Sequence, residues 1–273
     1  MARFERKMMD EILQLANEVQ EKNKAAALGI IVRTHGSTPR HSASKIIVYP
    51  DGSFKGSVGG GEVEGRVIRE ALDSLKDGKT RLLSYKMVDP TTGDPGICGG
   101  NLDIYVEPII PKPTLLVVGA GHVGKEVASL GKWLNFHVVV SDDREEFCNA
   151  EMHPDADSFL CVTMDKIPEE MEITPYTYIV LTTRGSSTDV AGLGPLLKTE
   201  PGYLGIIGSK KRWIETQKGL KNKGVDPEEF KGVNSPIGID LGAETPREIA
   251  LSILAEIMMA IHKTSGKTMK FER

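Results

Sequence analysis

The sequence predicts an α/β protein in which a smaller α+β domain precedes a C-terminal Rossmann-like domain with a parallel sheet. Two observations carry this prediction. In the second half of the chain, apolar runs of strand length alternate with helical segments, which is typical of a parallel sheet covered on both faces. The stretch PIIPKP at 108–113 holds three prolines and separates this half from an N-terminal half with a different pattern. We therefore predict two domains, 1–112 and 113–273.

The N-terminal half mixes both kinds of element. An amphipathic helix is predicted at the N-terminus, and a second helix is predicted over 62–76, where apolar residues recur at helical spacing. Apolar runs bounded by turn residues predict strands over 26–34, 45–50, 81–88 and 102–109. Mixed helices and strands without regular alternation indicate an α+β domain.

The C-terminal half alternates strand and helix. Strands are predicted over 114–119, 137–142, 159–162, 176–183 and 203–209. Helices are predicted over 122–134, near 189–198, and over 210–222. A last helix is predicted to begin at Thr245, Pro246 and Glu248, since threonine can cap, proline suits the first turn and glutamate completes a capping box.

Composition and charge narrow the class of protein. The chain of 273 residues is 40% hydrophobic and 26% charged, as in globular proteins. Its 34 Lys and Arg against 38 Asp and Glu give a net charge of −4, which disfavours nucleic acid as a partner. The longest apolar run, 249–261, contains Glu256 and is too short to span a bilayer, so no membrane partner is expected. Three cysteines without a CxxC pair fit a cytoplasmic protein and predict no metal site.

The most informative motif is LLVVGAGHVGKEVASLG, which follows a predicted strand and opens a predicted helix. It contains the GxGxxG spacing of a dinucleotide-binding turn, with the candidate residues Gly119, Gly121, His122, Val123 and Gly124. Glycines permit the tight turn and the close approach of a pyrophosphate, and the helix N-terminus offers free N–H groups to it. A glycine turn with only a structural role is the alternative.

Asp142 follows the next predicted strand. At this place a carboxylate would bond ribose hydroxyls and repel a 2′-phosphate. Any dinucleotide is therefore expected to be NAD-like rather than NADP-like. The motif carries no information about hydride transfer.

Two loops of the N-terminal half are candidates for binding an anion. In HGSTPRHSASK, Ser37 and Arg40 can bind a phosphate or another oxyanion, because arginine offers a bidentate fork. An ordinary solvated loop is the alternative for this segment. The second loop, VGGGEVEG, leads from a glycine run straight into a helix N-terminus and carries the candidates Gly59, Gly60, Gly61 and Glu64.

Three further polar residues follow predicted strands of the parallel sheet. Arg184 and Asp189 lie in LTTRGSSTD, and Ser209 lies in IIGSKKRW. Since loops at the carboxyl ends of parallel strands gather at one crevice, these side chains are candidates for cofactor contacts. Helix caps and solvated charges are the alternatives.

Cys98 lies between glycines in PGICGGNL, which makes it a loop residue rather than a core residue. As a thiolate it would be a nucleophile and a soft metal ligand. A merely packed thiol is the alternative. Cys148 and Cys161 are predicted to be packing residues.

Several of these segments together resemble the XdhC/CoxI family. They are GSTPRHSASKIIVYPDGSFKGSVGGGEVEG, GICGGNLDIYVEP, LLVVGAGHVGKEVASLGKWLNFHVVVSDDREEF, LTTRGSSTD, YLGIIGSKKR and SPIGIDLGAETPREIALSILAEI. They run in the order found in that family and cover nearly the whole chain.

The resemblance implies an accessory protein of molybdenum hydroxylases such as xanthine dehydrogenase. Such a protein binds molybdenum cofactor, as molybdopterin in its mono- or dinucleotide form. It protects the cofactor while a cysteine desulfurase helps to install the sulfido ligand, and it delivers the cofactor to the hydroxylase apoenzyme. It is a chaperone more than a catalyst. The resemblance also implies that Cys98, in the CGG motif, lies near the molybdenum or its sulfur, and that Arg40 and Glu64 lie near the same cleft.

Other functions remain open. An NAD-dependent oxidoreductase would fit the fingerprint and Asp142, although the chain has no Tyr-x-x-x-Lys proton relay. A sulfurtransferase would carry a persulfide on Cys98 and act on bound cofactor. NAD therefore stays a possible second ligand. A homodimer is expected, since a cofactor held between symmetric protomers is a natural arrangement.

Overall fold

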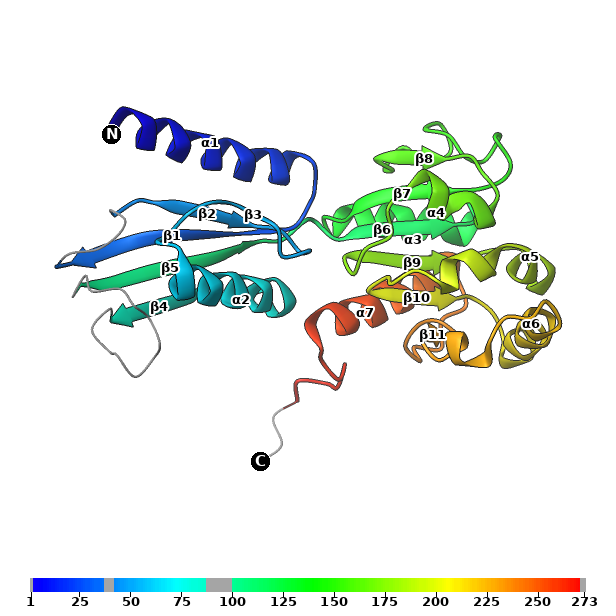
Figure 1. The fold of residues 1–273 in the computed structure, drawn as a ribbon. Coiled ribbons are helices and arrows are strands. Elements are labelled where there is room, and N and C mark those ends of the chain that lie inside the picture. Colours follow the sequence, from blue (N-terminus) through cyan, green and yellow to red (C-terminus); the bar gives the residue numbers. More distant parts are fainter. Residues whose placement is uncertain (1, 37–41, 87–99, 271–273) are drawn as a thin grey trace. The chain divides into compact units, whose positions relative to one another are not determined.

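The computed structural model describes residues 2–36, 42–86 and 100–270 (Figure 1). The chain divides into two compact units, Met1–Pro111 and Lys112–Arg273, and each contains one sheet. Within the described ranges, no helix has both the length and the apolar character that crossing a membrane requires.

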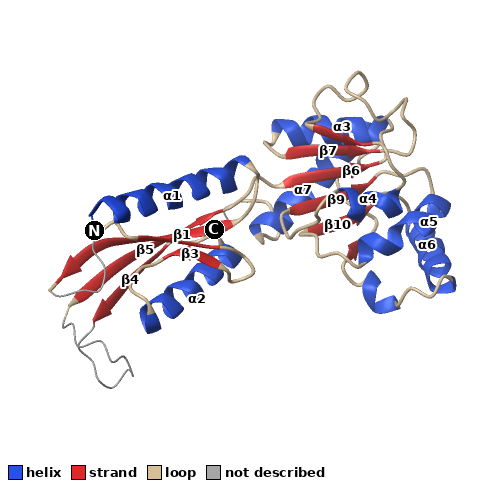
Figure 2. Ribbon diagram, turned by 45° about the horizontal axis from the view of Figure 1, so that its top comes forward, coloured by secondary structure: helices blue, strands red, loops and turns tan. Residues whose placement is uncertain are grey.

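The N-terminal unit is built on a five-stranded antiparallel sheet with the order β3-β2-β1-β5-β4. The helices α1 and α2 cover its opposite faces (Figure 2). The elements are α1 (Ala2–Glu21), β1 (Ala26–His35), β2 (Lys45–Val48), β3 (Phe54–Gly56), α2 (Gly61–Asp77), β4 (Arg81–Lys86) and β5 (Asn101–Ile109).

Alternation along β1 explains this two-sided packing. Ala26 and Leu28 belong to the hydrophobic cluster under α1, whereas Ala27 and Ile31 belong to the cluster under α2. Successive side chains of a strand point to opposite faces, so each face receives its own apolar set. Both helices are amphipathic and bury their apolar stripe on the sheet.

The C-terminal unit has a six-stranded parallel sheet with the order β11-β10-β9-β6-β7-β8, which confirms the predicted Rossmann-like class. Its strands are β6 (Thr114–Val118), β7 (His137–Ser141), β8 (Ser158–Leu160), β9 (Thr177–Leu181), β10 (Tyr203–Ile206) and β11 (Val233–Asn234). Its α-helices are α3 (His122–Trp133), α4 (Ile167–Glu170), α5 (Ser186–Leu197), α6 (Lys210–Asn222) and α7 (Pro246–His262).

The strands of this sheet are apolar on both faces because helices cover both. In β6, Leu115 and Val117 join the cluster formed with α3 and α7, and Leu116 and Val118 join the cluster formed with α5 and α6. The capping box of α7 is confirmed: the Glu248 N–H donates to Thr245 Oγ1, and Glu248 Oε2 accepts from the Thr245 N–H.

A buried ion pair ties α5, α6 and the end of β9 together. Asp189, in the first turn of α5, is completely buried, and Arg212 Nε and Nη2 donate to its Oδ2 at 3.0 and 2.8 Å. The hydroxyls of Thr183 and Thr216 donate to the same carboxylate. The expectation that Asp189 contacts a cofactor is therefore corrected, because its carboxylate is enclosed and bonded to its own protein.

Replacing Arg212 with alanine should lower the free energy of unfolding of this unit by about 3 kcal/mol, because it leaves the Asp189 carboxylate buried and unpaired. Both tryptophans of the chain, Trp133 and Trp213, belong to this unit, so their fluorescence during urea titration reports its unfolding. Lys231→Ala is the control, since Lys231 forms an exposed pair with Glu228. Equal effects of the two substitutions would contradict the structural role of the buried pair.

Candidate functional site

The glycine turn lies at the carboxyl end of β6, directly before α3. Gly119 has a φ of +108°, and a Cβ built there would lie 2.7 Å from the carbonyl oxygen of Thr182. The Thr182 hydroxyl donates to the Gly119 carbonyl at 2.6 Å. The turn is thus pressed against the end of β9, and only glycine fits at its first position.

The other two glycines of the motif serve different purposes. A Cβ at Gly124 would lie 2.0 Å from the Gly119 carbonyl oxygen, so this glycine lets α3 pack against the turn. At Gly121, by contrast, no described atom lies within 4 Å of the Cβ position. His122 is exposed at the start of α3, whereas Val123 packs against the hydrophobic cluster under that helix.

The first turn of α3 is open to an anion. Gly121 is its N-cap, and no described side chain caps it. The free N–H groups and the positive end of the helix dipole therefore face the space that Gly121 leaves. The helix α5 also begins at a glycine, Gly185, and lacks a side-chain cap among the described residues. In contrast, Ser209 caps α6 by accepting from the Arg212 N–H at 3.3 Å.

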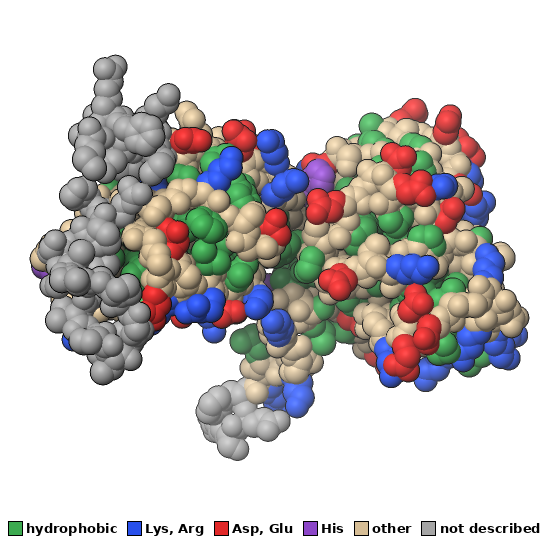
Figure 3. Space-filling view, viewed as in Figure 1, with side chains coloured by type: hydrophobic (Ala, Val, Ile, Leu, Met, Phe, Trp, Pro, Cys, Tyr) green, Lys and Arg blue, Asp and Glu red, His purple; other side chains and the backbone are tan. Residues whose placement is uncertain are grey.

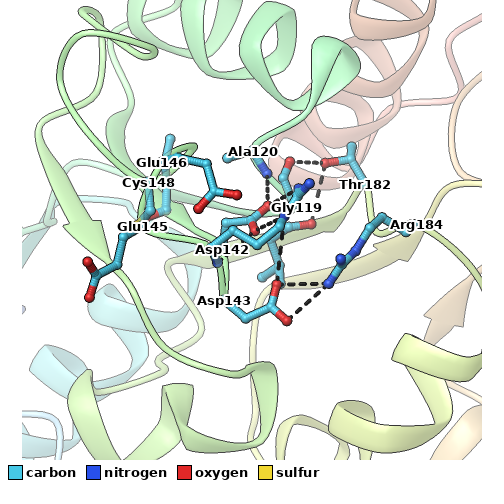
Figure 4. Close-up of polar contacts among 12 residues, drawn as sticks. Gly119, Ala120, Asp142, Asp143, Glu145, Glu146, Cys148, Thr182 and Arg184 are labelled. Atoms are coloured by element: carbon cyan, nitrogen blue, oxygen red, sulfur yellow. Dashed lines mark hydrogen bonds and ion pairs between the residues drawn. The ribbon is translucent and has the colours of Figure 1, made fainter.

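Asp142 follows β7 and lies beside the turn, only 5% exposed (Figure 4). Its Oδ2 accepts from the Ala120 N–H at 2.8 Å and from Arg144 Nη2 at 2.9 Å. Its Oδ1 accepts from the backbone N–H and the Nε of Arg144 at 3.1 and 2.8 Å. Burial would raise the pKa of Asp142, but the hydrogen bonds from Arg144 and Ala120 outweigh burial and lower the pKa to about 2.

These bonds give Asp142 a role that its position in the sequence does not indicate. The carboxylate holds Ala120, the middle residue of the glycine turn, against the end of β7. Because Arg144 occupies both oxygens, a ribose hydroxyl reaches the carboxylate only by displacing the guanidinium. A ribose contact by Asp142 stays a prediction.

A second arginine lies on the other side of the glycine turn. Arg184, which follows β9, donates from Nη2 to both carboxylate oxygens of Asp143 at 2.9 and 3.0 Å. Since β6 lies between β7 and β9 in the sheet, this ion pair joins the loops on either side of the glycine turn (Figure 4).

Near the turn, His153 was not predicted, whereas the prediction that Cys148 packs in the interior is confirmed. His153 is 2% exposed, its Nε2 lies 3.2 Å from the Ala120 carbonyl oxygen, and burial lowers its pKa. Cys148 is buried, and burial together with the neighbouring Cys161 raises its pKa to about 12. The packing prediction for Cys161 is wrong: it is exposed, and its Sγ donates to the Cys148 carbonyl at 2.9 Å.

The glycine run of the N-terminal unit forms a comparable helix start. Gly59, Gly60 and Gly61 have φ values of +143°, +74° and +58°, and α2 begins at Gly61 without a cap from any described side chain. No described atom lies within 4 Å of a Cβ at Gly60 or Gly61. Glu64 Oε2 accepts from the Val58 N–H at 3.3 Å and so holds the loop that precedes the helix.

Strand register brings two connections of this unit to one end of the sheet. Asn101 pairs with both His35 and Lys86. Hence β1 and β4 end, and β5 begins, at the same end (Figure 1). Gly56, which closes β3, lies further along the sheet, because it pairs with Ile46 and Ile46 pairs with Gly29, in the middle of β1. The segment that holds Ser37 and Arg40 leaves β1 at this end, and the segment that holds Cys98 connects β4 to β5 there, whereas the glycine run follows Gly56. Ser37, Arg40 and Cys98 themselves lie outside the described residues.

We expect acid to remove the stabilisation that Asp142 provides. The pKa of Asp142 is about 2 in the folded protein, against an ordinary value of 3.8. Its ionised form therefore stabilises the folded state by about 2 kcal/mol above pH 4, and this stabilisation is lost as the pH falls to 2. The difference in unfolding free energy between wild type and Asp142→Asn, followed by tryptophan fluorescence, should shrink over this range. Asp155→Asn is the control, since Asp155 is exposed and bonds to no described residue. A difference that does not change with pH would refute the role of Asp142.

Comparisons with known proteins cover both units. Residues 19–86 match the family described as XdhC and CoxI, and residues 115–257 match the XdhC Rossmann domain. A crystal structure of a Bacillus halodurans protein described as a xanthine dehydrogenase has a TM-score of 0.50 and 19% identity. That match covers 94% of this chain and 96% of the other, and it shows the fold alone.

Three relatives are similar in sequence. The uncharacterized protein YqeB of Escherichia coli K12 is 34% identical over 93% of this chain and 47% of its own length. A Bacillus subtilis 168 protein described as a probable subunit of xanthine dehydrogenase is 31% identical over 57% of this chain and 45% of its own length. The molybdenum cofactor insertion chaperone PaoD of Escherichia coli K12 is 25% identical over 90% of this chain and 86% of its own length.

The chain therefore spans about half the length of the first two of these relatives. The two family matches follow the order of the two units, and the Rossmann match alone takes in more than half of the residues. It follows that this chain belongs to the XdhC and CoxI family.

Proposed function

We propose that this chain is an accessory protein that binds molybdenum cofactor and inserts it into a molybdenum hydroxylase such as xanthine dehydrogenase. The observation that carries this proposal is the similarity to PaoD, a molybdenum cofactor insertion chaperone, which extends over 90% of this chain and so includes both units. The Bacillus subtilis relative, named for xanthine dehydrogenase, supports the same class of client.

The described residues suit the anionic end of such a cargo. Molybdenum cofactor ends in a phosphate or a dinucleotide, and a phosphate binds well at an uncapped helix start. The space beside Gly121 at α3 and beside Gly60 and Gly61 at α2 is free of described atoms. Each of these helix starts by itself fits the terminal phosphate of a mono- or a dinucleotide form, and the one at α3 also fits NAD.

We further propose that Cys98 contacts the molybdenum or its sulfur, and that a cysteine desulfurase provides the sulfur for the sulfido ligand. A thiolate is a soft ligand and a nucleophile, as this chemistry requires. In support, the segment with Cys98 connects β4 to β5 at the sheet end where β1 leads into the segment with Ser37 and Arg40. A homodimer would hold the cofactor between protomers.

The metal and pterin content of the protein tests the proposed cargo. Purified from a host that makes molybdenum cofactor, wild type should hold both in near-stoichiometric amounts, and Cys98→Ala should hold clearly less. Cys161→Ala, an exposed cysteine of the other unit, should match wild type. Molybdenum would be measured by mass spectrometry of the metal and pterin by fluorescence after oxidation.

The alternatives give different results in the same samples. If both molybdenum and pterin are absent and NAD is bound instead, the oxidoreductase is favoured. A mass increase of about 32 Da on Cys98, for one added sulfur atom, would favour the sulfurtransferase.

Two glycine substitutions separate binding from folding at the turn. Gly121→Ala should melt like wild type, since the position has a φ of −76° and open space. The added methyl group fills that space and should weaken phosphate binding about tenfold, which corresponds to a loss of about 1.4 kcal/mol of binding free energy. Gly124→Ala should instead destabilise the unit, because its Cβ would meet the Gly119 carbonyl at 2.0 Å. Unchanged cofactor content in Gly121→Ala would argue against this turn as the phosphate site.

A further inference from the structure

Two arginines lie on either side of the glycine turn, and they are held very differently. Arg144 forks onto the buried carboxylate of Asp142. Its guanidinium also lies over the ring of Phe147, 4.0 Å from the centroid. Arg144 is therefore fixed from two sides and belongs to the support of the turn.

Arg184 is bound on one side only. Its Nη2 donates to Asp143, while its Nε and Nη1 make no hydrogen bond with any described residue. The side chain of Arg184 is 54% exposed and that of Asp143 is 41% exposed. An exposed ion pair of this kind adds little stability and breaks easily. Of the two arginines, Arg184 is thus the one that can exchange its partner.

The ion pair of Asp143 and Arg184 lies in the loops beside the starts of α3 and α5. Asp143 follows β7 and Arg184 follows β9, and the turn after β6 lies between them (Figure 4). Arg184 directly precedes Gly185, the N-cap of α5. We expect an anion at the start of α3 to compete with Asp143 for the guanidinium of Arg184, because a phosphate is a strong bidentate acceptor for it.

We propose that Asp143 sets the affinity of the glycine turn for phosphate-containing ligands by holding Arg184 until such a ligand binds the guanidinium instead. The ligand class is a nucleotide with a pyrophosphate, which rests on the proposed function of this site. In this structure the ion pair bridges the two loops. In the complex Arg184 bonds the phosphate, and Asp143 keeps only its longer contact of 4.0 Å with Arg144 Nε.

General repulsion is the competing explanation for any effect of Asp143, because other acids surround it. Acidic side chains gather over β7 and β8 (Figure 3). Glu145 and Glu146 lie in the same loop as Asp143 and are exposed, and neither forms an ion pair with a described residue (Figure 4). Glu145→Gln therefore removes one negative charge from this loop without releasing an arginine, and it is the matched control.

The test is isothermal titration of the full chain with NAD and with inorganic pyrophosphate. Asp143→Asn should tighten binding about fivefold, the gain from releasing an exposed ion pair before the ligand binds. Glu145→Gln should change the affinity clearly less. Arg184→Gln should weaken binding, and in the double variant the gain from Asp143→Asn should disappear, because no arginine remains to be released.

Equal gains from Asp143→Asn and Glu145→Gln, or a gain that persists without Arg184, would show general repulsion and overturn the proposal. Absence of binding to wild type and to Asp143→Asn would overturn it as well. The molybdenum and pterin content of the same preparations judges the proposed function separately. A protein that carries the cofactor but shows no coupling between Asp143 and Arg184 keeps that function and loses only this inference.

Discussion

The hydrogen bond from the Ala120 N–H to Asp142 is the interaction on which the glycine turn and its surroundings depend. It fixes the middle of the glycine turn to the end of β7, while the Thr182 hydroxyl holds the preceding carbonyl to the end of β9. Between these two anchors the turn has little freedom, and α3 can begin directly at its edge. The N–H groups of that helix then face open space rather than protein.

The acceptor of this bond, the carboxylate of Asp142, also determines how the charged residues near the turn are paired. A buried carboxylate is stable only when it is paired and hydrogen-bonded, and Arg144 provides the pairing for Asp142. This leaves Arg184 as the exposed cation of the two flanking loops. Arg144 is fixed and Arg184 can exchange its partner because their acidic partners differ in burial. Asp142 is enclosed, whereas Asp143 is open to water. In the N-terminal unit, glycines again precede an uncapped helix, with Glu64 holding the loop.

Local patterns predicted most of the fold, because they were strong. The alternation of apolar runs and helices predicted the parallel sheet, and α6 has the predicted bounds 210–222. The short elements β3, β11 and α4 were missed, since two to four residues show no period. The glycine turn was located from its GxGxxG spacing and its place between a predicted strand and a predicted helix.

The site was harder to predict because side-chain partners depend on contacts between distant segments. Asp189 looked like a crevice residue, but Arg212, 23 positions further on, encloses it. His153 reaches Ala120 from a turn that carries no recognisable motif. The pairing of Asp142 with Arg144 is local, yet its effect lies at Ala120, on another strand end. The position of a residue at a strand end thus predicts where in the unit it lies. Its role there depends on its burial, which the position does not predict.

Cofactor transfer is the most direct test of the account. Purified chain loaded with molybdenum cofactor would be mixed with a xanthine dehydrogenase apoenzyme that lacks it, and hydroxylase activity would be followed over time. The account predicts that activity appears faster and reaches a higher level than with the same amount of free cofactor. Activation no better than that by free cofactor would contradict a role in insertion.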